Sequence, residues 1–498
     1  MWSAFVKRME PKTLTTEQVQ ESLPWVVKDG IVAQLLESLT AGPILIALAL
    51  LMKAPNALIG YMVALPLLSN LAQFPGAYLT EKIRKRKLVC TAISMIGRAS
   101  FFFIAWLAFF PATHGAAYIL AFLYTIRYFA SSFAGSAWNS WMKDLVPPQT
   151  LGRFFSKRLT MMVIASLVAS LSMAVILKVW PFPANDFYGI LAFIAFLLGV
   201  YSMYVYYRIQ EPPMEADPLE EHFFTKIKKV FKDRNFFLLM IFLGFWNFSI
   251  NLAVPFFSVY ILEQLKLSVS LVLILVTVSQ VTSVLVMGSW GKLADMFSNK
   301  SVLLVTCPLY VLAIFLFLFT SIPVEDTFTI PLLVFIYMLI GISQSGVTLA
   351  TGNITLKLAP KGSAAVYLSV NGMVNAFMAG IAPIIGGFFA DYFIEKKLSF
   401  ILNWTTPTTT KDFSLLVMQH WDFFFFMATI LALLSLSLLK AVKEEGEVNE
   451  KVVVSSFLSL FSRSMSVSYQ LPQKVFLFLS RKRYKEGLQK EKSGSMSE

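Results

Sequence analysis

Three ionisable residues stand in the middle of long apolar runs, where a charged side chain is hardest to place. They are Glu37, Arg98 and Arg127. A lone charge at the centre of a bilayer costs about 3 kcal/mol, so such side chains should face a water-filled cavity or one another. In a cavity, a carboxylate and a guanidinium can hold a charged solute or carry a proton, although the same pair can also form a static salt bridge. Arg98 lies nearer a helix end and could instead extend to the membrane surface.

Uncharged polar residues in the same apolar runs form a second group of candidates. Amide side chains offer both donors and acceptors of hydrogen bonds, which suits a polar metabolite. Each amide could equally bond one helix to its neighbour. The candidates for a solute cavity are Gln34, Asn247, Asn251, Gln280, Gln344 and Asn375.

Several kinds of site are not expected in this sequence. The histidines His114, His222 and His420 lie far apart, so no metal site and no cofactor are predicted. The chain has no phosphate-binding Gly-x-x-x-x-Gly-Lys motif, which argues against ATP-driven transport. The apolar runs contain no nucleophile–base pair and no paired carboxylates, so a membrane enzyme is disfavoured.

Twelve apolar runs must position the candidate residues. Hydrophobic residues make up 57% of the chain and charged residues 14%, whereas soluble domains carry about 25% charged residues. A helix of about 20 apolar residues spans a bilayer, and continuous apolarity excludes a barrel, whose strands alternate. The expected spans are 28–52, 56–79, 88–110, 116–141, 157–180, 186–208, 236–262, 268–290, 301–321, 329–357, 362–394 and 421–440.

Two short loops read as copies of each other and predict a tandem duplication. In each, a small residue is followed by a leucine two positions later, an acid four later and a base nine later. The acids Glu81 and Asp295 lie 214 positions apart, and a repeated unit of about 210 residues follows. The same offset pairs Glu37 with Asn251, so both halves are polar at matching depth, as a midplane site requires. The loop residues are Ala77, Glu81, Lys85 and Arg86 in one copy and Gly291, Asp295 and Lys300 in the other.

The positive residues fix the expected orientation. With the N-terminus inside, the linker and the inner loops hold 19 lysines and arginines, while the outer loops hold six. This asymmetry is typical of cytoplasmic loops. Because the bases are spread over short loops, the net charge of +13 does not indicate nucleic-acid binding.

The two loops and the twelve spans resemble the major facilitator superfamily over residues 25 to 440. The motif Gly-x-Leu-Ala-Asp with a later base follows the second helix of each half in that family; here Ala77 replaces the glycine and Glu81 the aspartate. The resemblance implies an all-α fold of two pseudo-symmetric six-helix halves that move a small solute by alternating access. It also places helices 1 and 4 at a central cavity, which makes Glu37 and Arg127 a candidate pair.

The loops themselves suggest a gate. A carboxylate at a helix end can pair with bases and cap a neighbouring helix, and a small residue lets helices approach closely. We expect Glu81 and Asp295 to hold helix ends together in one state and release them in the other. The alternative is a static anchor of positive charge.

These observations predict a secondary transporter for a small solute, with proton coupling left open and a non-transporting receptor or assembly factor as the alternative. We expect a monomer in a bacterial inner membrane, surrounded by lipid, with both termini in the cytoplasm. The expected division is an N-terminal segment at 1–27, a six-helix half at 28–208, a linker at 209–235, a second half at 236–440 and a basic tail at 441–498.

Overall fold

The computed structural model describes most of the chain between Leu14 and Ser459. The described residues are 14–110, 115–147, 151–179, 183–214, 228, 230–321, 326–360, 364–405, 410–419, 421–444, 452–457 and 459. Much of the predicted N-terminal segment, linker and basic tail lies outside them.

The N-terminal half is a bundle of six spans, in agreement with the sequence prediction. Two spans are interrupted: the first comprises α2 and α3, and the second comprises α4, a short 3-10 turn η1 and α5. The first breaks where Gly42, at a φ of 55°, precedes Pro43, which begins α3. The elements are α2 (Thr16–Thr40), α3 (Pro43–Leu51), α4 (Asn56–Leu68), η1 (Ser69–Ala72), α5 (Gln73–Ile83), α6 (Arg86–Phe109), α7 (Ala116–Leu145), α8 (Leu151–Val179) and α9 (Ala184–Arg208).

The C-terminal half repeats this arrangement. Polar side chains cap three of its helices: Asp233 caps α11, Ser268 caps α12 and Ser298 caps α13, each accepting a backbone N–H of the first turn. The elements are α11 (Arg234–Glu263), α12 (Val269–Met296), α13 (Asn299–Leu316), η3 (Phe317–Ser321), α14 (Asp326–Leu358), α15 (Ala364–Phe393) and α16 (Trp421–Ala441).

Together the two halves supply twelve helical spans. Eleven helical segments of the described chain are long and apolar enough to cross a membrane. The twelfth is α7, whose arginine, serines and tyrosines make it less apolar than the others. The predicted spans are therefore confirmed, with several boundaries corrected. The largest correction is that α2 begins at Thr16, while α8 begins at Leu151 and α12 ends at Met296.

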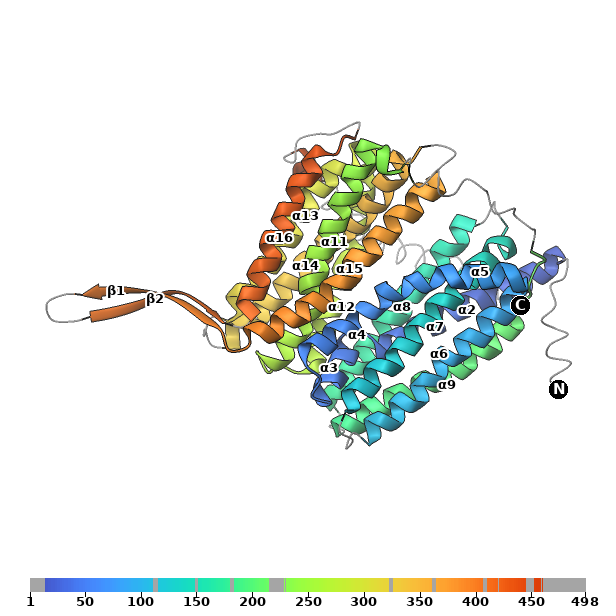
Figure 1. Cartoon of the computed structure of the whole chain (residues 1–498), viewed down its shortest axis with the longest axis horizontal. Coiled ribbons are helices and arrows are strands. Elements are labelled where there is room, and N and C mark those ends of the chain that lie inside the picture. Colours follow the sequence, from blue (N-terminus) through green and yellow to red (C-terminus); the bar gives the residue numbers. More distant parts are fainter. Residues whose placement is uncertain are drawn as a thin grey trace, which may run out of the picture.

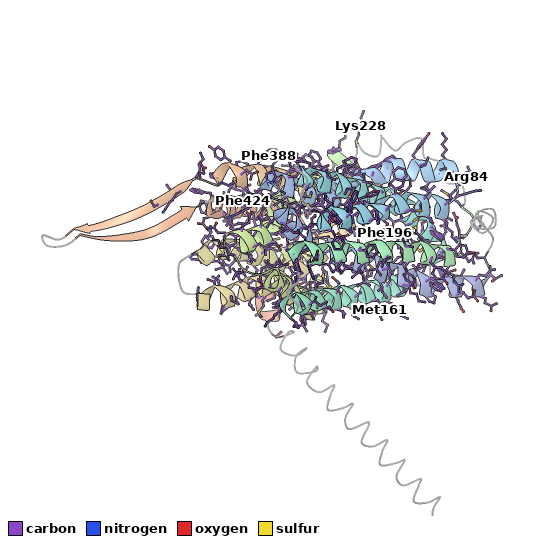
Figure 2. The ribbon with its side chains drawn as sticks, turned by 90° about the horizontal axis from the view of Figure 1, so that it is seen from below. Arg84, Met161, Phe196, Lys228, Phe388 and Phe424 are labelled. Carbon is purple, nitrogen blue, oxygen red and sulfur yellow. The ribbon has the colours of Figure 1, made fainter. Side chains whose placement is uncertain are left out.

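A β-hairpin separates the last two helices and is absent from the described part of the first half. Strand β1 (Lys397–Thr405) pairs antiparallel with β2 (Thr410–Gln419), and the hairpin projects from the helices (Figures 1 and 2). Strands are not among the elements predicted from the sequence. The signal was the run of aromatic and β-branched residues in 400–405, which favours a strand. We call the end of the molecule that bears this hairpin the hairpin end.

The two halves meet at the hairpin end and diverge away from it. Helices α4 and α15 pack along each other, as do α8 and α12. At the opposite end, α5 and α9 of one half lie far from α13 and α16 of the other (Figure 1). We call this opposite end, where residues 209–214 leave α9, the linker end; Arg84 marks it in Figure 2.

Close backbone packing and one carboxylate join the halves at the hairpin end. Asp391 accepts hydrogen bonds from the backbone N–H groups of Asn56 and Ala57, at 3.2 and 2.9 Å, and from Nδ2 of Asn56, at 2.9 Å. It thereby caps the free N-terminus of α4 from the other half. Nearby, a Cβ on Gly60 would lie 2.1 Å from the carbonyl oxygen of Pro383, so only glycine permits this approach.

Candidate functional site

A cavity of about 330 Å³ lies inside the N-terminal half. Residues from α2, α6, α7, α8 and α9 line it, so five helices of one bundle surround it. Such a volume is at the lower end of small-molecule sites. Its charged lining residues are Asp29, Glu37, Arg98, Arg127 and Arg158.

Glu37 and Arg127 form an ion pair on the wall of this cavity. The guanidinium Nη2 of Arg127 donates to Oε2 of Glu37, and the Tyr128 hydroxyl donates to Oε1 at 3.2 Å. The Arg127 guanidinium also lies over the Tyr128 ring, 4.1 Å from its centroid, and 5.2 Å from that of Phe101. The structure thus brings the predicted pair together; its part in coupling stays a prediction.

A second ion pair, which the sequence analysis missed, joins Asp29 to Arg158 across 3.5 Å. Arg158 also donates from Nε to the carbonyl of Val26 at 3.3 Å and lies over the Trp138 ring at 4.5 Å. Asp29 escaped notice because the expected helix began at residue 28, and Arg158 was counted among the loop bases. In fact Asp29 lies in the middle of α2 and Arg158 within α8. The recurrence of Asp29, Ala33 and Glu37 every four residues was the available signal.

Arg98 is the third cation of the cavity, and it does not extend to the membrane surface. Its Nη2 donates to the Tyr206 hydroxyl at 3.1 Å, and its guanidinium lies 4.9 Å from the centre of that ring. Gly199 leaves room for it, since a Cβ there would lie 3.0 Å from Cβ of Arg98. Within the described chain, Nη1 of Arg98 is buried and has no hydrogen-bond partner.

The predicted amides divide between the two halves. Gln34 lines the cavity. The five amides of the C-terminal half do not line it: Asn251 donates to the carbonyl of Asn247 at 2.8 Å, and Asn247 donates to that of Leu243 at 2.8 Å. Asn247 also reaches Oδ1 of Asn375 at 3.4 Å, so these amides act within and between helices. Gln344 bonds Thr348 at 3.3 Å, and Oε1 of Gln280 is buried without a described partner.

The two repeated loops lie at the linker end, and their acids face solvent. Glu81 and Asp295 are exposed, and neither makes a hydrogen bond or ion pair with a described residue. Ala77 is also exposed; the close approach to α7 occurs one residue earlier, where a Cβ on Gly76 would lie 2.5 Å from the carbonyl oxygen of Phe133. Gly291 has only ordinary contact space, with Leu349 at 3.6 Å. In this structure neither Ala77 nor Gly291 makes the close helix contact expected of it, and the gating role of the two loops stays a prediction.

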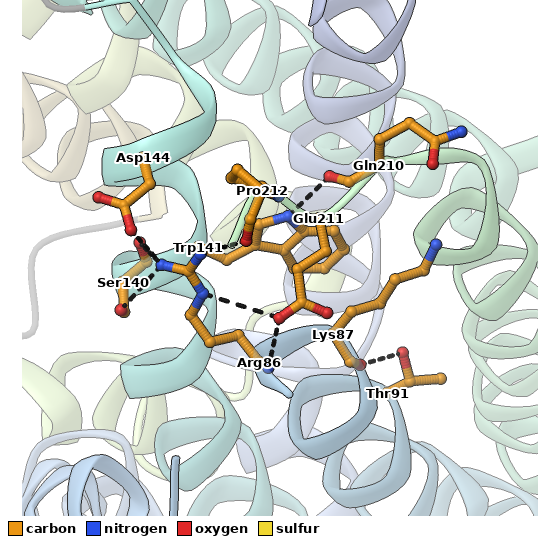
Figure 3. A network of polar contacts seen from close by, with 9 residues as sticks. All are labelled: Arg86, Lys87, Thr91, Ser140, Trp141, Asp144, Gln210, Glu211 and Pro212. Carbon is orange, nitrogen blue, oxygen red and sulfur yellow. Dashed lines mark hydrogen bonds and ion pairs between the residues drawn. The ribbon is translucent and has the colours of Figure 1, made fainter. Parts of the chain in front are cut away.

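The final bases of the two motifs, Arg86 and Lys300, are buried in polar clusters instead. Arg86 is fully buried; it pairs with Asp144 and donates from Nη2 to the carbonyl of Pro212 at 2.7 Å (Figure 3). Glu211 accepts the backbone N–H of Arg86 at 2.6 Å and lies 3.7 Å from its Nε. Burial raises the pKa of the Glu211 carboxyl, against the lowering effect of the backbone N–H groups of Arg86 and Lys87.

The second half builds the equivalent cluster around Glu444. This carboxylate accepts the backbone N–H of Lys300 at 2.7 Å, Nδ2 of Asn299 at 2.9 Å and Nζ of Lys357 at 3.0 Å. Glu211 and Glu444 each follow the sixth helix of a half and cap its third helix. The repeat offset of 214 did not reveal that these two acids correspond, because the hairpin lengthens their spacing to 233 positions. Lys85 is half-buried beside Arg86.

Comparison with known proteins agrees with this architecture. Among solved structures, a mutant of the nucleoside transporter NupG has a TM-score of 0.66 at 14% identity, over 85% of this chain and all of that one. The inward-open xylose transporter XylE from E. coli gives 0.59 at 12% identity, over 87% and 99%. A D-xylose-proton symporter gives 0.59 at 14% identity, over 85% and 99%. No curated protein sequence matches this chain.

The family model described as "Major Facilitator Superfamily" matches residues 30–383 and 248–476. These matches cover most of the chain and include both repeated loops. The chain is thus a transporter rather than an enzyme, and it belongs to the Major Facilitator Superfamily.

Proposed function

We propose that this secondary transporter is a proton-coupled symporter in which Glu37 carries the proton. The solute binds in the cavity of the N-terminal half, next to the Glu37–Arg127 pair. The observation that carries the proposal is this pair, an ionisable acid and a buried base on the wall of one cavity.

The unequal exposure of the two side chains supports a proton-carrying role for Glu37. The Glu37 side chain is 43% exposed, whereas that of Arg127 is 8% exposed. Cavity water can therefore reach the carboxylate, while aromatic rings hold the guanidinium in place. Protonation of Glu37 weakens its bond to Arg127, because a charge-assisted hydrogen bond becomes an ordinary one. One solved structure with a similar fold is named a D-xylose-proton symporter, and this name states that its solute is coupled to protons.

We place the linker end in the cytoplasm of a bacterial inner membrane, with both termini on that side and the monomer as the working unit. The concentration of lysine and arginine near this end supports the orientation. In this orientation the two halves are joined toward the outside and diverge toward the cytoplasm (Figure 1). The acids Glu81 and Asp295 then lack partners in the described chain because the contacts they serve belong to the state closed at the cytoplasm.

Transport in proteoliposomes tests the coupling role. A solute found by screening metabolite classes is supplied with or without an imposed pH gradient. We expect Glu37→Gln to abolish gradient-driven accumulation and to leave counterflow exchange intact, since exchange needs no net proton movement. Glu21→Gln, which changes an exposed acid near the start of the same helix, is the matched control. Unchanged accumulation in a folded Glu37→Gln protein would remove Glu37 from the coupling role.

A further inference from the structure

We infer that the solute is a small organic anion, held by the guanidinium groups of Arg98 and Arg127. The inference rests on the proposed function in one respect, that solute binds in the cavity of the N-terminal half. It adds the charge and chemical class of that solute.

The charge balance of the cavity is the first argument. Three arginines and two carboxylates line it, so its described ionisable lining carries one net positive charge when all five are ionised. Glu37 pairs with Arg127 and Asp29 with Arg158, while Arg98 has a neutral tyrosine as its bonded partner. Asp29 attracts both Arg98 and Arg158, so one carboxylate serves two guanidinium groups. An anionic solute completes this balance, whereas a cation adds to the excess.

Two buried N–H donors without hydrogen-bond partners also favour an anion, because the oxygens of an anionic group are hydrogen-bond acceptors. Nη1 of Arg98 and Nη1 of Arg127 are both buried without hydrogen-bond partners in the described chain. Buried N–H donors that lack a partner are costly and rare, so a site that leaves two of them is suited to an acceptor. Guanidinium groups bind carboxylate and phosphate oxygens best, through paired N–H donors.

The cavity also offers polar and apolar contacts to the remainder of the solute. Oδ1 of Asp29 is also buried without a described partner, and Asp29 is 2% exposed. Nε1 of Trp138 interacts with the same carboxylate and is likewise buried without a described partner, so a donor and an acceptor stand together where a hydroxyl group of the solute can bind. The rings of Phe101 on α6 and Trp138 on α7 supply apolar walls. A cavity of about 330 Å³ accommodates a small metabolite rather than a peptide or an oligosaccharide.

An anionic solute also explains how binding and protonation become linked. The Arg127 guanidinium can pair fully with an anionic solute only when its ion pair with Glu37 is broken. Protonation of Glu37 removes the carboxylate charge and so breaks this ion pair. One proton on Glu37 and one anion beside Arg127 enter together and leave the net charge of the site unchanged. The charged or titratable groups that face Glu37 are Arg127, Tyr128 and Tyr124 on α7, Asp29 on its own helix, Arg98 on α6 and Arg158 on α8.

Ligand-induced thermal stabilisation of the purified protein tests the inference without transport or a proton gradient. The probes are matched pairs of similar shape: lactate with lactamide, and glycerol phosphate with glycerol, within a wider set of small carboxylates and phosphate monoesters and their neutral counterparts. We expect stabilisation by one or more anions and by none of the neutral partners. The carboxylate and phosphate arms identify which oxyanion fits. Stabilisation by neutral members alone, or by no anion in the set, overturns the inference.

Two variants assign the effect to the cavity. Arg98→Gln removes one guanidinium and should weaken the stabilising anion about tenfold to a hundredfold. Arg84→Gln, at an exposed arginine of the linker end, should leave its affinity unchanged. Equal affinities in the two variants would contradict binding at Arg98. If anions bind but the Glu37→Gln protein still accumulates solute, the proton-carrying role of Glu37 fails and the anionic solute stands. If the transported solute is neutral and its accumulation depends on protons, the anionic solute fails and the proton-carrying role stands.

Discussion

Arg127 keeps its charge inside the bundle because a carboxylate and aromatic rings surround its guanidinium. Glu37 neutralises it, and the faces of Tyr128 and Phe101 add cation–π contacts. The same logic holds at Asp29, where Arg158 and the Trp138 ring complete a second group. Each charge of these two groups is therefore stabilised by a specific partner, and removal of one partner should strongly destabilise the protein.

Asp29→Asn should destabilise the protein, because it leaves the charge of Arg158 without its carboxylate. Breaking a buried ion pair costs about 3–5 kcal/mol, and thermal unfolding in detergent should show a clear fall in midpoint. The double variant Asp29→Asn with Arg158→Gln removes both charges and should recover part of the loss. A double variant as unstable as the sum of the two single ones would show that the pair is not coupled.

At the scale of helices, a carboxylate caps the N-terminus of the third helix in each half. Glu211 caps α6 and Glu444 caps α13, and each carboxylate also meets a basic side chain. In the C-terminal half, Phe457 stacks on Trp290 with ring centroids 4.1 Å apart, and Val453 is fully buried. A segment of the C-terminal tail thus packs directly beside the loop that begins at Gly291.

Glu444→Ala should loosen the start of α13 and the contact with Lys357. Charge-assisted hydrogen bonds contribute about 1.5–3 kcal/mol each, so amide hydrogen exchange at 299–303 should rise by about tenfold or more. Glu263→Ala, at an exposed acid that ends α11, provides the comparison. Exchange at 299–303 that is equal in the two variants would show that Glu444 is not the cap.

The sequence predicted the positions of the helices far better than it predicted which helices pack against each other. Continuous apolarity located the spans, and isolated charges pointed to Glu37 and Arg127. Asp29, Arg158, Glu211 and Glu444 were missed, because their roles depend on which helix packs beside which, and a single chain's periodicity does not contain that information. The bonds of the α11 amides were likewise not predictable, since Asn247 and Asn251 bond the backbone of their own helix in this structure and their part in solute binding stays a prediction.

At the scale of the whole molecule, the two halves are joined at one end and apart at the other. Asp391 holds α4 at the hairpin end, whereas Glu81 and Asp295 stand exposed at the linker end. An acid that caps a helix of the opposite half thus lies at one end, and the two exposed acids lie at the other. If they alternate, the loss of each acid should favour opposite states.

Distances between spin labels on the two halves test this claim of alternating access most directly. The endogenous cysteines Cys90 and Cys307, both buried, are first replaced by alanine. Labels at Tyr78 and Met296 then report the linker end, and labels at Lys178 and Gln264 report the hairpin end; all four positions are exposed.

We expect two distance populations at each end, changing in opposite directions. Asp391→Asn weakens the cap on α4 and should shift the population toward a wider hairpin end and a narrower linker end. Asp295→Asn should widen the linker end and narrow the hairpin end. Distances that stay single at both ends, or that change at one end while the other is unaffected, would contradict a transporter that opens its two ends in alternation.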